Sequence, residues 1–95
     1  MNSEAQKKAM RNYMRKKKYG ITSAEFETLI AKQGNVCGIC EQPEITTREA
    51  TVRALTVHVK NKVKTLLCHK CNMALGHMNN DSTLLRKAAD YLDNI

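Results

Sequence analysis

Four cysteines form two pairs with the spacing of metal-binding knuckles, Cys37-x-x-Cys40 and Cys68-x-x-Cys71. Each pair can present two thiolates from one tight turn, and two such turns complete the tetrahedron of ligands that Zn²⁺ prefers. Four sulfurs fill the coordination shell and leave no position for water, so the pattern predicts a structural zinc ion and not a catalytic one. Zinc binding at such sites is worth about 10–16 kcal/mol in small peptides, as much as the whole stability of a small domain.

The same cysteines have weaker explanations that need no zinc. Two disulfides would need an oxidising compartment, but residues 1–7 lack the apolar stretch of a signal peptide, so we expect a cytoplasmic protein with reduced thiols. The cysteines could also be free and buried, or form a redox dithiol, although the redox motif belongs to a βαβ context that is absent here. His69 lies between Cys68 and Cys71 and could compete as a ligand, but we expect it at the surface.

The charge of the chain favours a polyanionic partner such as DNA. Sixteen Lys and Arg residues against nine Asp and Glu residues give a formal net charge of +7. Residues 1–20 carry one acid and seven bases, which predicts a basic N-terminal helix or arm. Its candidate phosphate contacts are Lys7, Lys8, Arg11, Arg15, Lys16, Lys17 and Lys18. The alternative for this segment is a solvated, frayed arm, and no apolar run is long enough for a membrane span.

The elements expected between these sites make one small domain, residues 1–95. Thr22 and Glu25 have the spacing of a capping box, and Gly34 can end the helix that follows. Alternating β-branched and polar residues predict a hairpin over 51–68, in which a three-residue turn at 60–62 would pair Val59 with Val63.

Two helices are expected after the second cysteine pair. A short helix over 72–75 should end at Gly76, and a final helix should begin near Asp81 or Ser82. Six apolar residues form a stripe along that final helix, and we expect the stripe to pack into the core. Its members are Leu84, Leu85, Ala88, Tyr91, Leu92 and Ile95.

Several segments together resemble the recombination endonuclease VII family of phage-type, zinc-stabilised nucleases. The segments are residues 19–22 opening a helix, Gln33-Gly34 before the first knuckle, a hairpin, residues 66–72 across the second knuckle, and residues 74–76. The resemblance covers about residues 15 to 93. It implies a small α+β fold with a ββα-metal (His-Me finger, HNH-like) core, a four-cysteine zinc site and flanking helices at both ends.

The resemblance also implies a catalytic site, and here the chain departs from the family pattern. The family places an Asp-His pair at the end of the first strand, where Asp binds a magnesium-type ion and His activates water. Counting back from Cys68 puts Leu55 and Thr56 at those positions and His58 at a second family histidine; anchoring on Leu55-x-Val57 instead puts His58 at the family Asp. Asn72 stands at the family position that completes the metal site.

Neither alignment restores a carboxylate, because no Asp or Glu occurs between Ala50 and Asn80. Mg²⁺ prefers charged oxygen ligands, so we expect catalysis by His58 and Asn72 to be lost or severely weakened. The same region carries only cations, which could bind phosphate or could form a solvated strand face. These cations are Arg53, Lys60, Lys62, Lys64 and Lys70.

Three functions follow as hypotheses. The first is a zinc-stabilised, endonuclease VII-like DNA-binding protein that is catalytically impaired, a pseudoenzyme. The second is an active endonuclease on branched or single-stranded DNA, which alone would require Mg²⁺ or Mn²⁺. The third is a phage-encoded inhibitor that binds a host protein in the host cytoplasm. Whether the chain forms a homodimer stays open.

Overall fold

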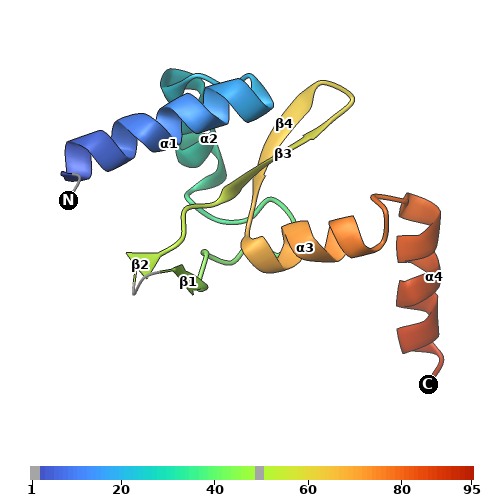
Figure 1. The fold of residues 1–95 in the computed structure, drawn as a ribbon. Coiled ribbons are helices and arrows are strands. Elements are labelled where there is room, and N and C mark those ends of the chain that lie inside the picture. The colour runs from blue at the N-terminus through green and yellow to red at the C-terminus, as the bar shows by residue number, and fades with distance from the viewer. Residues whose placement is uncertain (1–2, 49–50) are drawn as a thin grey trace.

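The structure is a computed structural model that describes residues 3–48 and 51–95. The described part contains four helices and two small antiparallel sheets, with helices at both ends of the chain, which confirms the small α+β class (Figure 1). The elements are α1 (Glu4–Tyr19), α2 (Ser23–Gln33), β1 (Thr47–Arg48), β2 (Thr51–Val52), β3 (Thr56–Lys60), β4 (Val63–Leu67), α3 (His69–His77) and α4 (Ser82–Asp93). The succession β3, β4, α3 is the expected ββα unit, and it carries the second cysteine pair at its centre.

Local capping signals define the first two helices. The Thr22 hydroxyl accepts a hydrogen bond from the backbone of Glu25, whose side chain accepts one from the Thr22 backbone. This reciprocal pair is the predicted capping box, and Gly34 ends α2 in the left-handed conformation with φ +67, as predicted. Gly20 ends α1 with the same φ. The chain therefore turns sharply at Gly20 and at Gly34. Helix α1 packs against β3 and helix α2 against β4.

The β3–β4 hairpin exists as predicted, but its register differs by one residue. Only Asn61 and Lys62 form the turn, both with positive φ as two-residue type I′ turns require, and Lys60 pairs with Val63. The expected three-residue turn and the pairing of Val59 with Val63 are therefore wrong. In the observed register Val57 faces Leu66 across the sheet, and both side chains are buried.

The strand predicted to begin at residue 51 is divided in two. Residues 51–52 form β2, which pairs with β1 through Thr47 and Val52, and the central hairpin begins only at Thr56. Strands β1 and β2 thus form a two-stranded sheet of their own. Residues 49 and 50, between β1 and β2 in the sequence, lie outside the described residues.

The core is small and lies where α2, the two knuckles and the central hairpin meet. Two of the buried core residues, Cys37 and Cys68, are also candidate zinc ligands, so the metal site is part of the core. The buried residues are Ile21, Phe26, Cys37, Leu55, Val57, Leu66, Leu67 and Cys68. Because so few apolar side chains are buried, we expect the chain to depend on metal binding for its stability.

Helix α3 begins earlier and ends later than predicted. Cys68 is its N-cap residue, so the helix begins at His69 within the second knuckle, and it ends at His77. Gly76 therefore lies inside the helix and does not terminate it. The φ angle of Gly76 is not positive, so this residue does not adopt the left-handed conformation in which Gly20 and Gly34 end their helices.

Helix α4 corrects the expectation that its apolar stripe packs into the core. Asp81 caps the helix as predicted, with its carboxylate accepting from the backbone of Thr83 and Leu84. However, α4 contains no buried residue, and Tyr91 and Leu92 are 65% and 66% exposed. Figure 1 shows α4 turned away from α3 and from the rest of the molecule. An amphipathic stripe specifies that a face is apolar, but it does not specify what covers that face.

No helix in the described ranges combines the length and the apolar character needed to cross a bilayer.

Candidate metal centre and nucleic-acid interface

The four cysteine sulfurs converge on one point. The Sγ atoms of Cys37, Cys40, Cys68 and Cys71 all lie within 4.8 Å of one another, and the Sγ atoms of Cys40 and Cys68 are 3.8 Å apart. A tetrahedron with Zn–S bonds of about 2.3 Å has edges of about 3.8 Å, so the donor set fits zinc in chemistry and in size. The predicted zinc ligands are thus brought together, and His69 is not among them.

Two thiols of the cluster differ strongly in how easily they ionise. Burial opposes ionisation of Cys37, but backbone N–H groups from both knuckles outweigh it and lower the pKa of this thiol to about 6. Burial raises the pKa of Cys71 to about 12, and the three neighbouring thiols add to this effect. Without an ion, one thiol of the cluster therefore ionises easily while another keeps its proton. Zinc binding must expel that proton.

Gln33 and Gly38 attach the first knuckle to strand β4. The Gln33 side chain donates to the carbonyl of Leu66 at 2.9 Å and accepts from the Leu66 N–H at 2.9 Å, as a neighbouring strand would. The Gly38 N–H donates to the same carbonyl at 3.0 Å. A Cβ at Gly38 would lie 2.8 Å from Cγ2 of Thr65, so a glycine is needed for this close approach. These contacts place the first cysteine pair beside the second.

Glu44 is a buried carboxylate that sequence reasoning missed. Its Oε1 accepts from the Thr46 backbone and hydroxyl, at 3.0 and 2.7 Å, and its Oε2 accepts from the His69 backbone N–H. Burial opposes ionisation, but these hydrogen bonds prevail and lower the pKa of Glu44 below its ordinary value. The His69 N–H lies in the first turn of α3, where a helix favours negative charge. The contact with Thr46 is local, but the contact with the His69 N–H joins residues 25 positions apart and depends on the fold, so the sequence did not identify Glu44.

His58 and Asn72 lie on neighbouring elements, β3 and α3, which pack against each other. The hydrogen-bond partner of His58 is nevertheless in the loop before α4, where its Nε2 lies 3.2 Å from Oδ1 of Asn80. Lys60 donates to the Asn80 carbonyl at 3.3 Å. In the part of the chain that the structure describes, the cysteines are the only group of three or more metal-ligand side chains. An imidazole and an amide without a carboxylate do not fit Mg²⁺.

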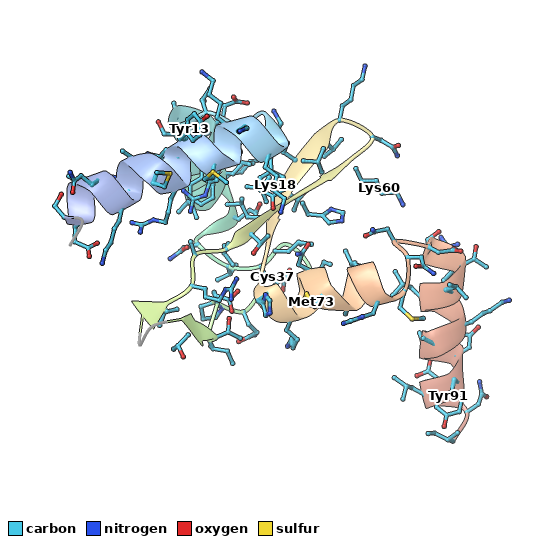
Figure 2. The ribbon with its side chains drawn as sticks, in the orientation of Figure 1. Tyr13, Lys18, Cys37, Lys60, Met73 and Tyr91 are labelled. Atoms are coloured by element: carbon cyan, nitrogen blue, oxygen red, sulfur yellow. The ribbon has the colours of Figure 1, made fainter. Side chains whose placement is uncertain are left out.

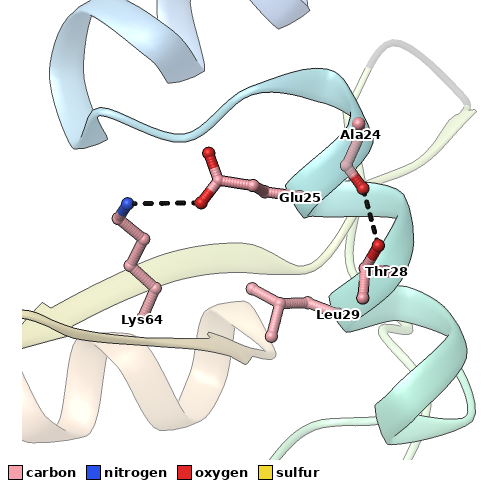
Figure 3. Close-up of a pocket in the computed structure, with 5 residues that line it drawn as sticks. All are labelled: Ala24, Glu25, Thr28, Leu29 and Lys64. Carbon is pink, nitrogen blue, oxygen red and sulfur yellow. Dashed lines mark hydrogen bonds and ion pairs between the residues drawn. The ribbon is translucent and has the colours of Figure 1, made fainter.

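Arg15 and Lys64, two of the predicted phosphate contacts, are half-buried and have partners within the domain. The Arg15 guanidinium lies 3.8 Å from the centre of the Phe26 ring, and burial, followed by the nearby charge of Arg11, lowers the pKa of Arg15. Lys64 donates to the Gly20 carbonyl at 3.1 Å and lies 3.7 Å from a Glu25 carboxylate oxygen, at the rim of a shallow, largely apolar pocket against α2 (Figure 3). Both cations hold α1 and α2 in place.

Most of the other predicted contacts lie on the surface. Lys18 is near the end of α1, close to the hairpin that carries Lys60 (Figure 2), and α1 packs against β3. Arg53 is half-buried. The exposed cations in the set are Lys7, Lys8, Arg11, Lys16, Lys17, Lys18, Lys60, Lys62 and Lys70. The cations of α1 and of the hairpin thus occupy adjoining elements.

Comparison with known proteins identifies the family. No curated protein and no solved structure is significantly similar to the chain. A family model described as recombination endonuclease VII matches residues 12–94, nearly the whole chain. The match spans the two knuckles, the central hairpin and α3, whose geometry is that of a zinc-stabilised ββα unit. The chain therefore belongs to the recombination endonuclease VII family.

Proposed function

We propose that the chain is one zinc-stabilised domain that binds DNA and cuts it poorly or not at all. The single observation that carries the second part is the burial of Leu55. In the ungapped alignment Leu55 takes the position of the family Asp, and its side chain is only 4% exposed within the core. In that alignment, a position that would hold a divalent cation in an active enzyme is used for packing; in the other alignment the position is occupied by His58, which supplies no carboxylate either. The family's DNA substrates and the net charge of +7 support the first part.

DNA binding through the exposed cations predicts a steep dependence on salt. Each phosphate contact releases condensed counterions, so the logarithm of the affinity falls by about 0.9 per contact for each decade of salt. We expect duplex DNA affinity, measured by fluorescence anisotropy between about 50 and 200 mM salt, to fall by orders of magnitude. An affinity that does not change with salt would contradict the proposal.

A charge-matched pair of variants locates the surface. Lys16→Ala with Lys62→Ala removes two cations from α1 and the hairpin turn, whereas Arg86→Ala with Lys87→Ala removes two exposed cations from α4. We expect the first double variant to lower the salt slope by about two and the second to leave it unchanged. Equal losses in both variants would mean that only net charge matters, and would reject the assigned surface.

An active endonuclease is the second candidate, because His58 and Asn72 lie on contacting elements of a nuclease family. The test is cleavage of a four-way junction and of a plasmid with Mg²⁺, Mn²⁺ or Ni²⁺. We expect no cleavage above the level of a His58→Ala, Asn72→Ala double variant. Cleavage by the natural chain that the double variant loses would establish these two residues as the catalytic site and overturn the proposed impairment.

A protein partner is the third candidate, and the exposed members of the α4 stripe, Tyr91, Leu92 and Ile95, favour it. The partner is either a second copy of this chain or, if the chain is phage-encoded, a host protein in the reducing host cytoplasm, where the thiols stay available for zinc. Sedimentation at several protein concentrations detects the homodimer. Capture from a nuclease-treated bacterial lysate, compared with Leu92→Asp, detects a host partner. A monomer that captures nothing in stoichiometric amount would remove this candidate.

A further inference from the structure

The outer face of α1 carries exposed side chains that neither the core nor the zinc site uses. Met10 and Tyr13 are each 59% exposed, and Met14 is 51% exposed. Residues three and four apart lie on one side of a helix, so these three form a continuous stripe. At 100° per residue this stripe lies opposite the side on which Arg15 and Tyr19 contact the core. The stripe is therefore directed away from the domain.

Tyr13 differs from the other tyrosine of α1 in what surrounds it. Tyr19 is half-buried and packs against the core, so its ring is already used. The Tyr13 ring is accessible, and the Lys17 ammonium lies 5.9 Å from its centre. Cations occur along the whole helix, and its one acid, Glu4, lies 3.8 Å from Lys7 at the far end. An accessible ring within a cationic surface complements a ligand that has both negative charge and flat aromatic groups.

We infer that Tyr13 is a stacking platform for an unpaired base of single-stranded DNA. In this arrangement the Tyr13 ring stacks on one base, Met10 and Met14 contact its edges or the adjacent sugar, and Lys17 binds the neighbouring phosphate. A duplex presents phosphates but keeps its bases stacked inside, so it can use the lysine and cannot use the ring. This inference rests on the proposed DNA binding and specifies which form of DNA the N-terminal helix recognises.

The test compares two ligands and three variants at one salt concentration. Fluorescein-labelled oligo(dT) and a duplex of the same length are titrated with the natural chain, Tyr13→Ala, Tyr13→Phe and Tyr91→Ala. Tyr91 on α4 is the matched control, since it is a tyrosine of similar exposure at 65%. We expect Tyr13→Ala to weaken oligo(dT) binding by about five- to a hundredfold and to leave duplex binding within about twofold. Tyr13→Phe keeps the ring and should bind like the natural chain, as should Tyr91→Ala.

The outcomes separate this inference from the proposed function. If all variants bind the duplex and Tyr13→Ala keeps its oligo(dT) affinity, the stacking platform is rejected and DNA binding stands. If Tyr13→Phe is as weak as Tyr13→Ala, or if duplex and oligo(dT) binding fall equally, stacking is likewise rejected. If the natural chain binds neither ligand, the proposed function itself fails. Loss of binding to phosphatidylglycerol vesicles in Tyr13→Ala, with oligo(dT) affinity unchanged, would assign the stripe to a membrane surface instead.

Discussion

Glu44 connects two parts of the chain that are far apart in the sequence. Its carboxylate accepts hydrogen bonds from Thr46 in its own loop and from the His69 backbone at the start of α3. The contact joins the segment after the first knuckle to the residue that follows Cys68. At the scale of single residues, the geometry of the zinc site thus depends on a side chain that is not a zinc ligand.

Replacing Glu44 by alanine should destabilise the zinc-loaded protein. The change leaves the His69 N–H and the Thr46 hydroxyl and N–H without their partner, which costs about 1–3 kcal/mol in the free energy of unfolding. Glu44→Gln keeps one acceptor and should cost less. The measurement is denaturant unfolding with zinc in excess, with Glu27→Ala on the exposed side of α2 as the control. If Glu44→Ala and Glu27→Ala lower the free energy of unfolding equally, the buried Glu44 contacts do not contribute to stability.

The titration of the cysteines predicts how zinc affinity depends on pH. Cys71, with a pKa raised to about 12, must lose a proton when zinc binds near neutral pH. Above about pH 6 we therefore expect the apparent zinc affinity to rise by at least about tenfold per pH unit. Below about pH 6 Cys37 also becomes protonated in the metal-free chain, and the dependence should become steeper. Competition with a chromophoric chelator at several pH values measures this, and a pH-independent affinity would contradict it.

At the scale of elements, the first knuckle is docked on β4 through contacts that tolerate no added atom. Gly38 approaches Thr65 so closely that a Cβ would be 2.8 Å from Cγ2. Gln33, at the end of α2, pairs with both backbone groups of Leu66. Helix α2, the first knuckle and β4 are therefore joined by direct contacts, and a zinc ion bound by the four cysteines would join them to α3.

Gly38→Ala should separate the knuckle from the strand. The overlap with Thr65 costs about 1–3 kcal/mol of stability and should also weaken zinc retention against a chelator. Adding Thr65→Ser removes Cγ2 and should restore part of the lost stability. The measurement is the melting temperature of the single and the double variant, each with zinc in excess. A double variant no more stable than Gly38→Ala alone would mean that the clash has another source.

Gly76→Ala is predicted to have the opposite effect. A Cβ at Gly76 meets no atom within 4 Å, and the residue lies inside α3 without a positive φ. Alanine at a helical position is more stable than glycine by about 0.5–1 kcal/mol, so the melting temperature should rise. A lower melting temperature would indicate that Gly76 does end the helix, as its sequence context had predicted.

At the scale of the whole molecule, the chain is elongated and its last helix contributes nothing to the core. The principal extents are 51 × 31 × 23 Å, and α4 extends beyond the zinc-centred unit (Figure 1). The core and both knuckles lie between residues 21 and 71. The described part of the molecule therefore consists of a metal-centred unit with a basic helix at one end and an amphipathic helix at the other.

Removing α4 should leave the metal-centred unit folded. A chain ending at Asp81 keeps all eight buried core residues and all four cysteines, so we expect one bound zinc ion per chain and a melting temperature within a few degrees of the full chain. Circular dichroism and metal analysis at low micromolar concentration measure both. Cys68→Ala is the contrasting variant and should lose zinc and fold together. A truncated chain that fails to fold would mean that α4 covers the core.

The local features of the fold and the metal centre could be predicted from the sequence. The capping box of Thr22 and Glu25, the end of α2 at Gly34, the Asp81 cap and each of the two cysteine pairs depend on residues within a few positions of one another. Such signals act through the adjacent backbone, so distant parts of the chain do not alter them. The absence of an acid between Ala50 and Asn80 is also a property of the sequence alone.

Only the tertiary structure decided how these local units are combined. A two-residue and a three-residue turn suit the same alternating pattern, so the hairpin register depended on burying Val57 with Leu66. The His69 partner of Glu44 and the Gly20 and Glu25 partners of Lys64 lie more than twenty residues away, where composition gives no guide. The stripe on α4 is apolar in either case, and only the folded molecule leaves Tyr91, Leu92 and Ile95 exposed while Leu84, Leu85 and Ala88 are half-buried. The periodicity of apolar residues determines which side of a helix or strand is apolar, and the fold determines which other residues pack against that side.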